Sequence, residues 1–298
     1  MAGGVIFMKP RKLLPLFVLL FAIAAAAVTN RIYGTSAVPV SGGDGKDLLI
    51  VMYHSVLKDA SKTGKYVVTP DNVKNDIEYL KNNGYTFVSA QEVIDYSESN
   101  TGLPDKAAML TFDDGNYNFY GYVVPILEQT GANAIVSVVG SYTDEYSESN
   151  IKNMSYGYMR WSEVYDMFLS NRVEVGNHSY DFHSTDKGRN GSKKNKNESM
   201  EEYKEIFISD TEKAQNRFMT KTGFTPIIYT YPFGAYTEET AEWLRDMGFK
   251  MSLGCTEGIN RITHDSASLY FLKRYNRPGG MSTEQFFSEI LKGQSSSS

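Results

Sequence analysis

The chain has 298 residues, of which 41% are hydrophobic and 22% charged, with a formal net charge of -5 and a pI near 5.5. These values are typical of globular proteins and exclude a largely disordered chain and a polytopic membrane protein. The negative balance also argues against nucleic acid as a partner, because binding phosphates requires clustered Lys and Arg. Cys255 is the only cysteine, which excludes an intrachain disulfide.

The N-terminal segment has the layout of an export signal. Basic residues at positions 9–12 precede an uncharged apolar run over residues 13–28. Small side chains offer cleavage sites, while the run could also remain as a slightly short membrane anchor. We therefore expect an exported protein at the extracellular face, either anchored or secreted, with residues 1–30 as signal or anchor, 31–46 as linker, 47–293 as the folded domain and 294–298 as a disordered tail.

Strand-like and helix-like stretches alternate through the rest of the chain. Apolar runs predict strands over residues 48–53, 107–112, 134–139, 173–175, 226–231, 249–253 and 270–272. Amphipathic stretches, several of them opened by Ser, Thr or Asp, predict helices over residues 71–83, 122–129, 162–170, 199–221, 237–247 and 283–291. This alternation indicates a parallel sheet with helical cover, and the number of units favours a closed or nearly closed β/α barrel.

Two adjacent carboxylates, Asp113 and Asp114, follow the strand-like run at residues 107–112 and precede Gly115. Neighbouring residues at a strand end point in different directions, so one carboxylate can bind a metal while the other handles a proton. The alternative is an ordinary Asp-Gly turn that caps a helix.

His178 and His183 follow the run at residues 173–175, and they are two of only four histidines. An interval of five residues separates them by about 140° on a helix, so a shared metal ion requires a loop instead. Two imidazoles and one carboxylate are a common ligand set for a hydrolytic metal ion. The alternative is a pair of histidines with no common ligand.

Two further candidates also come at predicted strand ends. His54 ends the first strand, where β/α barrels place catalytic groups; a His held by local hydrogen bonds is the alternative. The sequence over residues 229–234 places Pro232 and Gly234 around Phe233, which predicts a tight turn able to aim the Phe233 backbone N–H at an oxyanion. By itself this segment indicates only a turn.

Taken together in chain order, the motifs over residues 111–115, 178–183 and 231–234 resemble the polysaccharide deacetylase family, carbohydrate esterase family four, which contains the NodB homology domain. The resemblance implies a distorted (β/α)7 barrel. It also implies that Asp113 is the general base, that Asp114, His178 and His183 hold a divalent metal, and that Phe233 supplies the oxyanion-hole amide. Zinc is the expected metal, with iron, cobalt or nickel as alternatives on the same ligands.

The interval of five residues between the histidines resembles the exported poly-N-acetylglucosamine deacetylase branch, which also has Tyr-His near the domain start. This likeness implies that His54 is the general acid and that the barrel is circularly permuted. Thr230 stands where many relatives have an Arg that orients the base, so Arg274 or Arg277 is the candidate substitute.

The predicted function is therefore metal-dependent removal of acetyl groups from an N-acetylglucosamine polysaccharide of the cell surface or biofilm matrix. A peptidoglycan deacetylase of the cell wall would use the same motifs. A glycan-binding protein that has lost turnover is a third alternative, for which Thr230 is the one supporting feature. Protein partners are not predicted.

Overall fold

A computed structural model describes residues 45–99 and 101–292. The predicted signal or anchor (1–30), nearly all of the predicted linker (31–46) and the predicted tail (294–298) lie outside these residues. The first strand begins at Lys46, one residue before the expected start of the domain. Across residues 45–99 and 101–292, no helix combines the length and hydropathy that a bilayer-spanning segment requires.

A nine-stranded sheet forms the centre of the described region, and β2 and β3 form a separate pair. The strands are β1 (Lys46–Tyr53), β2 (Ser55–Val56), β3 (Val67–Val68), β4 (Thr86–Phe87), β5 (Ala107–Phe112), β6 (Ala134–Val138), β7 (Val173–Asn177), β8 (Ile228–Thr230), β9 (Met251–Leu253), β10 (Asn260–Ile262) and β11 (Tyr275–Asn276). The main order is β10-β1-β5-β6-β7-β8-β9. The pairs from β1 through β9 are parallel, and β10 is antiparallel to β1.

The sheet curls so that its two ends approach each other through one late segment of the chain. Leu272 forms a bridge with Leu253 of β9, and β11 then pairs with Val51 and Met52 of β1. Residues 272–276 therefore connect β9 back to β1. This curled sheet corresponds to the distorted barrel expected from the sequence.

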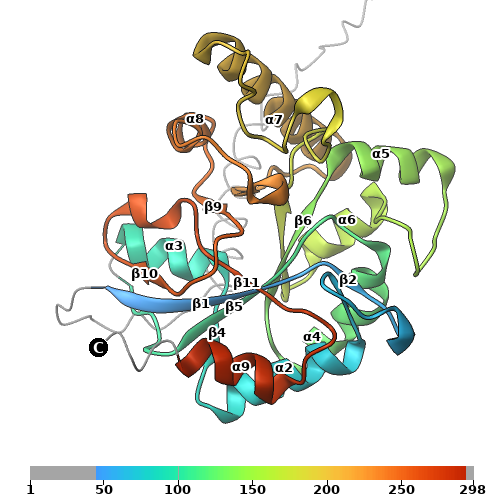
Figure 1. Ribbon diagram of the computed structural model, residues 1–298, viewed down its shortest axis with the longest axis vertical. Coiled ribbons are helices and arrows are strands. Elements are labelled where there is room, and N and C mark those ends of the chain that lie inside the picture. The colour runs from blue at the N-terminus through green and yellow to red at the C-terminus, as the bar shows by residue number, and fades with distance from the viewer. Residues whose placement is uncertain (1–44, 100, 293–298) are drawn as a thin grey trace, which may run out of the picture. The chain divides into compact units, whose positions relative to one another are not determined.

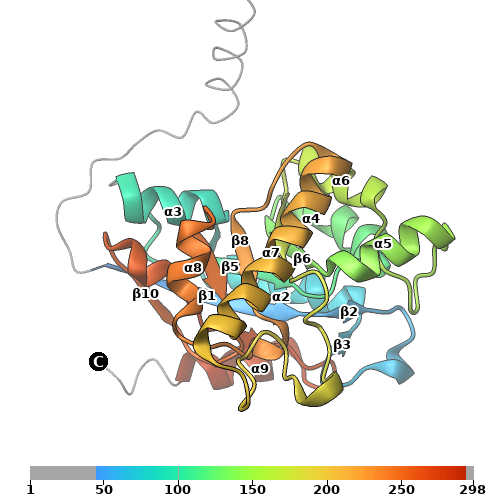
Figure 2. The same cartoon turned by 90° about the horizontal axis from the view of Figure 1, so that it is seen from above.

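Helices cover the sheet on the outside. They are α2 (Pro70–Asn82), α3 (Ala90–Ser99), α4 (Val124–Thr130), α5 (Gly140–Ser149), α6 (Trp161–Leu169), α7 (Met200–Thr222), α8 (Thr240–Asp246) and α9 (Thr283–Lys292). Figures 1 and 2 both show α3 and α9 on opposite sides of β1. All six residues of β5 are buried, as expected for a parallel strand that is covered on both faces.

The predicted helices correspond to α2, α4, α6, α7, α8 and α9, and six of the seven predicted strands overlap an observed strand. The prediction over residues 270–272 was wrong, because only Leu272 makes a bridge there and the strand follows at Tyr275–Asn276. Helices α3 and α5 have no predicted counterpart. Helix α5 buries only Gly140 and Thr143 and so has no apolar stripe. Strands of two or three residues, such as β4 and β10, are too short to show alternation.

Parallel strands bring their C-terminal ends to one edge of the sheet. His54 follows β1, the Asp113-Asp114 pair follows β5, His178 follows β7, and the turn containing Phe233 follows β8. The fold therefore gathers the candidate site residues at one end of the barrel, although they are spread over 180 positions of the sequence.

Candidate metal centre and active site

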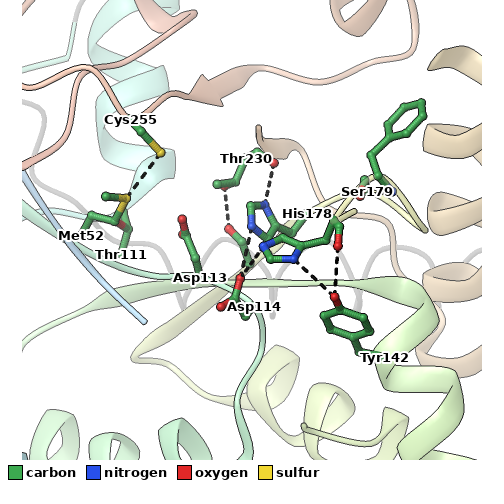
Figure 3. Close-up of polar contacts among 12 residues, drawn as sticks. Met52, Thr111, Asp113, Asp114, Tyr142, His178, Ser179, Thr230 and Cys255 are labelled. Carbon is green, nitrogen blue, oxygen red and sulfur yellow. Dashed lines mark hydrogen bonds and ion pairs between the residues drawn. The ribbon is translucent and has the colours of Figure 1, made fainter. Parts of the chain in front are cut away.

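Asp114, His178 and His183 come together at this end of the barrel. One ligand atom from each lies within 4.8 Å of those of the other two. The Nε2 atoms of His178 and His183 face the same carboxylate oxygen, Asp114 Oδ1, at 3.5 and 3.1 Å. Figure 3 shows the imidazole ring of His178 beside Asp114. The predicted ligand set is thus assembled in one place.

The backbone at the end of β5 turns sharply to present Asp114. The N–H of Asp113 still donates to the carbonyl of Tyr53 on β1, at 2.9 Å. Asp114 and Gly115 then both adopt positive φ, at 71° and 72°. A Cβ at position 115 would lie 2.6 Å from Val138 Cγ1, so only glycine fits beside β6. This turn separates the two carboxylates, as the motif predicted.

Outer hydrogen bonds orient both imidazoles. Nδ1 of His178 lies 2.7 Å from the carbonyl oxygen of Thr230, and Nδ1 of His183 lies 3.3 Å from the hydroxyl of Tyr142. Such partners on the far nitrogen are typical of histidines that bind a metal through Nε2. Asp114 Oδ1 is buried, and apart from the two facing Nε2 atoms it has no polar partner within the described part of the chain. This oxygen and the two nitrogens fit a divalent cation of the zinc type.

The charges within this group are strongly coupled. Burial raises the pKa of Asp114, but hydrogen bonds from His178 and His183 overcome that effect and hold it far below its ordinary value. Burial lowers the pKa of His178, yet the hydrogen bond to Asp114 and the nearby Asp113 raise it overall. Asp114 and His178 therefore each favour the charged form of the other.

Asp113 does not join the three ligands; it is paired with Arg274. The Nη1 and Nη2 atoms of Arg274 donate to Oδ1 and Oδ2 of Asp113 at 2.8 and 2.9 Å. Both side chains are buried. Burial raises the pKa of Asp113, but the positive charge of Arg274 outweighs it and holds the pKa below its ordinary value. Asp113 is thus kept ionised and able to accept a proton.

Arg274, and not Arg277, takes the place of the missing arginine at Thr230. Arg277 instead pairs with Asp76, with Nε 2.8 Å from Oδ2. The Thr230 hydroxyl lies 2.7 Å from the hydroxyl of Ser137. Arg274 reaches Asp113 from residues 272–276, the segment that connects β9 to β1.

His54 lies near this centre but makes no hydrogen bond to it. Its Nδ1 atom is buried and has no hydrogen-bond partner among residues 45–99 and 101–292, and its ring lies against Tyr66 with centroids 4.7 Å apart. Burial lowers the pKa of His54, although the charges of Asp113 and Asp114 oppose the shift. His54 is therefore mainly neutral at pH 7.

Phe233 occupies the turn after β8. Its φ of 58° is unusual for a residue with a side chain, and Gly234 follows at 63°. A Cβ at position 234 would lie 2.4 Å from the Cβ of Cys255, so glycine is required there. The Phe233 ring packs against His183, with centroids 4.5 Å apart. The predicted turn is present, and it lies beside a candidate ligand.

The polysaccharide deacetylase family matches residues 100–252, just over half of the chain. The chain belongs to this family. The poly-beta-1,6-N-acetyl-D-glucosamine N-deacetylase of Escherichia coli (strain K12) is 24% identical over 266 residues, covering 83% of this chain and 39% of that protein. The protein of the same name from Staphylococcus epidermidis is 20% identical over 212 residues, covering 71% and 68%. The chain thus spans well under half the length of the first relative.

Solved structures of other proteins share the fold. A de-N-acetylase from Aggregatibacter actinomycetemcomitans is 26% identical and matches with a TM-score of 0.68, covering 83% of this chain and 99% of that one. IcaB from Ammonifex degensii matches with a TM-score of 0.64 at 24% identity, covering 79% and 93%. The predicted (β/α)7 barrel is confirmed by these neighbours.

Some residues around the site gave no signal in the sequence. Tyr142 and the Thr230 carbonyl orient the two imidazoles, and Asp210 accepts hydrogen bonds from the loop between them. Tyr142 lies on α5, which, like α3, was not predicted from the sequence. The one sequence signal for Tyr142 was its position shortly after a strand, because residues 139–142 follow the end of β6 at the same edge of the sheet.

Proposed function

We propose that this protein hydrolyses N-acetyl groups of a poly-N-acetylglucosamine polysaccharide and releases acetate. The observation that carries the proposal is the placement of two imidazole nitrogens beside Asp114 Oδ1, together with a separate, ionised carboxylate on Asp113. Amide hydrolysis by a metal requires this combination of ligands and base. The relatives named as poly-beta-1,6-N-acetyl-D-glucosamine N-deacetylases support this choice of polymer.

Asp114, His178 and His183 would hold the metal, with zinc expected and iron, cobalt or nickel as alternatives. When bound, such an ion supplies a Lewis acid that polarises the acetyl carbonyl and acidifies water. The outer contacts of Thr230 and Tyr142 keep Nε2 of each histidine directed at that position.

The remaining steps are carried out by side-chain and backbone groups of the chain itself. Asp113 removes a proton from the attacking water, and Arg274 holds its carboxylate in place and ionised. The backbone N–H of Phe233 donates to the oxygen of the acetyl group as negative charge develops there. The carbon–nitrogen bond then breaks, giving acetate and an amine.

The departing amine needs a proton, and we assign its delivery to His54. Because His54 is mainly neutral at pH 7, it must first gain a proton. The proton that Asp113 takes from water is the source, so the proton count balances within one turnover. Export to the extracellular face, by a cleaved signal or a retained anchor over residues 13–28, would bring this site to its polymer.

Acetate release tests the proposal directly. The zinc-loaded protein should release acetate from β-1,6-linked N-acetylglucosamine oligomers, stop after chelation and resume when metal is added back. Chito-oligomers and purified peptidoglycan are the comparison substrates. Faster release from peptidoglycan would assign the enzyme to the cell wall instead. No release from any substrate, with metal bound, would identify a glycan-binding protein.

Replacing His54 by Ala should lower kcat by about 10²- to 10⁴-fold, the usual contribution of a proton donor, while metal content stays unchanged. His264→Ala is the matched control, because His264 hydrogen-bonds the carbonyl of Tyr96 through Nδ1 and does not contact the site. Turnover and metal content are measured on both purified variants. Equal kcat values for His54→Ala and the unsubstituted protein would remove His54 from the mechanism.

A further inference from the structure

The loop that joins the two candidate histidine ligands is held from outside by one carboxylate. Asp210, on α7, accepts hydrogen bonds from two successive backbone N–H groups, Tyr180 N to Oδ1 and Asp181 N to Oδ2, each at 2.8 Å. Both oxygens are therefore used, one for each amide. Asp210 lies 27 positions beyond His183 and touches neither imidazole.

This loop has a conformation that requires support. Ser179 adopts a φ of 69°, a left-handed conformation that is strained for a residue with a side chain. On the side opposite Asp210, the carbonyls of Ser179 and Tyr180 accept N–H groups of Gly140 and Ser141 at the start of α5. The two peptide groups after Ser179 are thus hydrogen-bonded to α7 on one side and to the start of α5 on the other.

The positions of the two histidines depend unequally on these hydrogen bonds to the loop. The backbone N–H of His178 donates to the carbonyl of Val138 on β6, so His178 is fixed by the sheet. His183 lies five residues further on, and within the described residues its polar contacts are to Asp114 and Tyr142. The position of its Nε2 atom relative to His178 is therefore set by the path of residues 179–182.

We propose that Asp210 is a positioning residue for the metal centre, whose carboxylate shapes the loop so that His183 meets Asp114 and His178, and thereby sets the affinity for a divalent cation. This inference rests on the proposed function only in assuming that the three ligands bind metal. Residues that orient metal ligands without binding the metal themselves typically contribute about 10- to 100-fold to metal affinity.

The electrostatic setting of Asp210 agrees with this role. Burial raises its pKa to about 6, with the two backbone N–H groups opposing the shift. At pH 7 the carboxylate is therefore mostly ionised and can accept at both oxygens. Asp181 and Lys213 are its charged neighbours, and the cavity of about 980 Å³ on this side of the loop is also lined by the charged residues Asp186, Arg189, Glu198 and Glu205.

The test is zinc affinity of the apo protein, measured by competition with a chromophoric chelator at pH 7.5. Asp210→Asn keeps the shape of the side chain, but its amide group can accept only one of the two N–H bonds. We expect its affinity for zinc to fall about 10- to 100-fold. Glu205→Gln, which removes one negative charge from the same helix and cavity, should bind zinc like the unsubstituted protein.

Each other outcome counts against the proposal. Asp210→Asn with a lower melting temperature but unchanged zinc affinity would show a merely structural role, and an equal loss in Glu205→Gln would show a general charge effect. If Asp210→Asn does not fold, Asp210→Glu, one methylene longer, should fold and bind zinc more weakly; unchanged affinity would overturn the proposal. Absence of zinc binding by the unsubstituted protein would overturn it as well.

The proposed function is tested by acetate release, separately from zinc affinity. An unsubstituted protein that binds zinc but releases no acetate would end the deacetylase proposal, while the affinities of the Asp210 variants would still support or refute the positioning role. Where turnover is measurable, the loss in Asp210→Asn should be recovered by raising the zinc concentration. Loss that persists at saturating zinc would mean that Asp210 does not act through metal binding.

Discussion

Replacing Asp113 by Asn should lower kcat by about 10²- to 10⁴-fold while the protein still binds zinc. The amide cannot take a proton from water, whereas the ligands Asp114, His178 and His183 remain in place. One hydrogen bond with Arg274 is also lost, because the new NH₂ group faces Nη2. The measurement is acetate release per metal-loaded molecule, with metal content determined on the same sample.

Asp76→Asn is the matched control for this experiment. Asp76 is also a buried aspartate paired with a buried arginine, Arg277, and it too loses one charge-assisted bond on substitution. Its kcat per folded molecule should stay near that of the unsubstituted protein, even if its stability falls. Near-normal kcat in Asp113→Asn, or an equal fall in both variants, would exclude Asp113 as the base.

The sequence predicted this base because a local pattern was sufficient. A buried strand that ends in Asp113-Asp114-Gly115 specifies the turn, and strand ends share one edge in a parallel barrel. The same rule placed His54, His178 and Phe233 at that edge. Local patterns therefore identified the residues that directly follow the strands, and this fold places its candidate catalytic residues at those positions.

Contacts between distant segments could not be predicted in this way. Arg274 and Arg277 are three residues apart, both are buried, and each pairs with an aspartate. Only the path of residues 272–276 across the gap between β9 and β1 decides which of them reaches Asp113. The role of Asp210 could not be predicted either. In the sequence it is one polar residue among many on the long helix α7, and only the structure shows that the loop after β7 contacts it.

Arg274 is expected to link the stability of the barrel to its chemistry. Besides the two bonds to Asp113, its Nε donates to the carbonyl of Gly254 at 2.6 Å and its Nη1 to the hydroxyl of Thr111 at 3.1 Å. Arg274 thus joins β5 to the chain that follows β9. Removal of one partner from a buried ion pair leaves an uncompensated charge and costs about 3–5 kcal/mol.

Arg274→Met should therefore lower the free energy of unfolding by about 3–5 kcal/mol and also reduce kcat, because Asp113 loses both its orientation and the charge that keeps it ionised. Arg277→Met is the control, since it breaks an equally buried pair with Asp76 and should lower stability without lowering kcat per folded molecule. Urea unfolding and acetate release are measured on both variants. Equal kcat losses would mean that reduced stability alone explains the effect.

A second substitution separates the two roles of this pair. When Asp113→Asn is added to Arg274→Met, the buried negative charge is removed as well, so part of the lost stability should return while kcat stays at the level of Asp113→Asn alone. Such non-additivity is expected for two side chains in direct contact. Simple addition of the two stability losses would show that Arg274 and Asp113 do not interact in the folded protein, and the ionised base would then need another explanation.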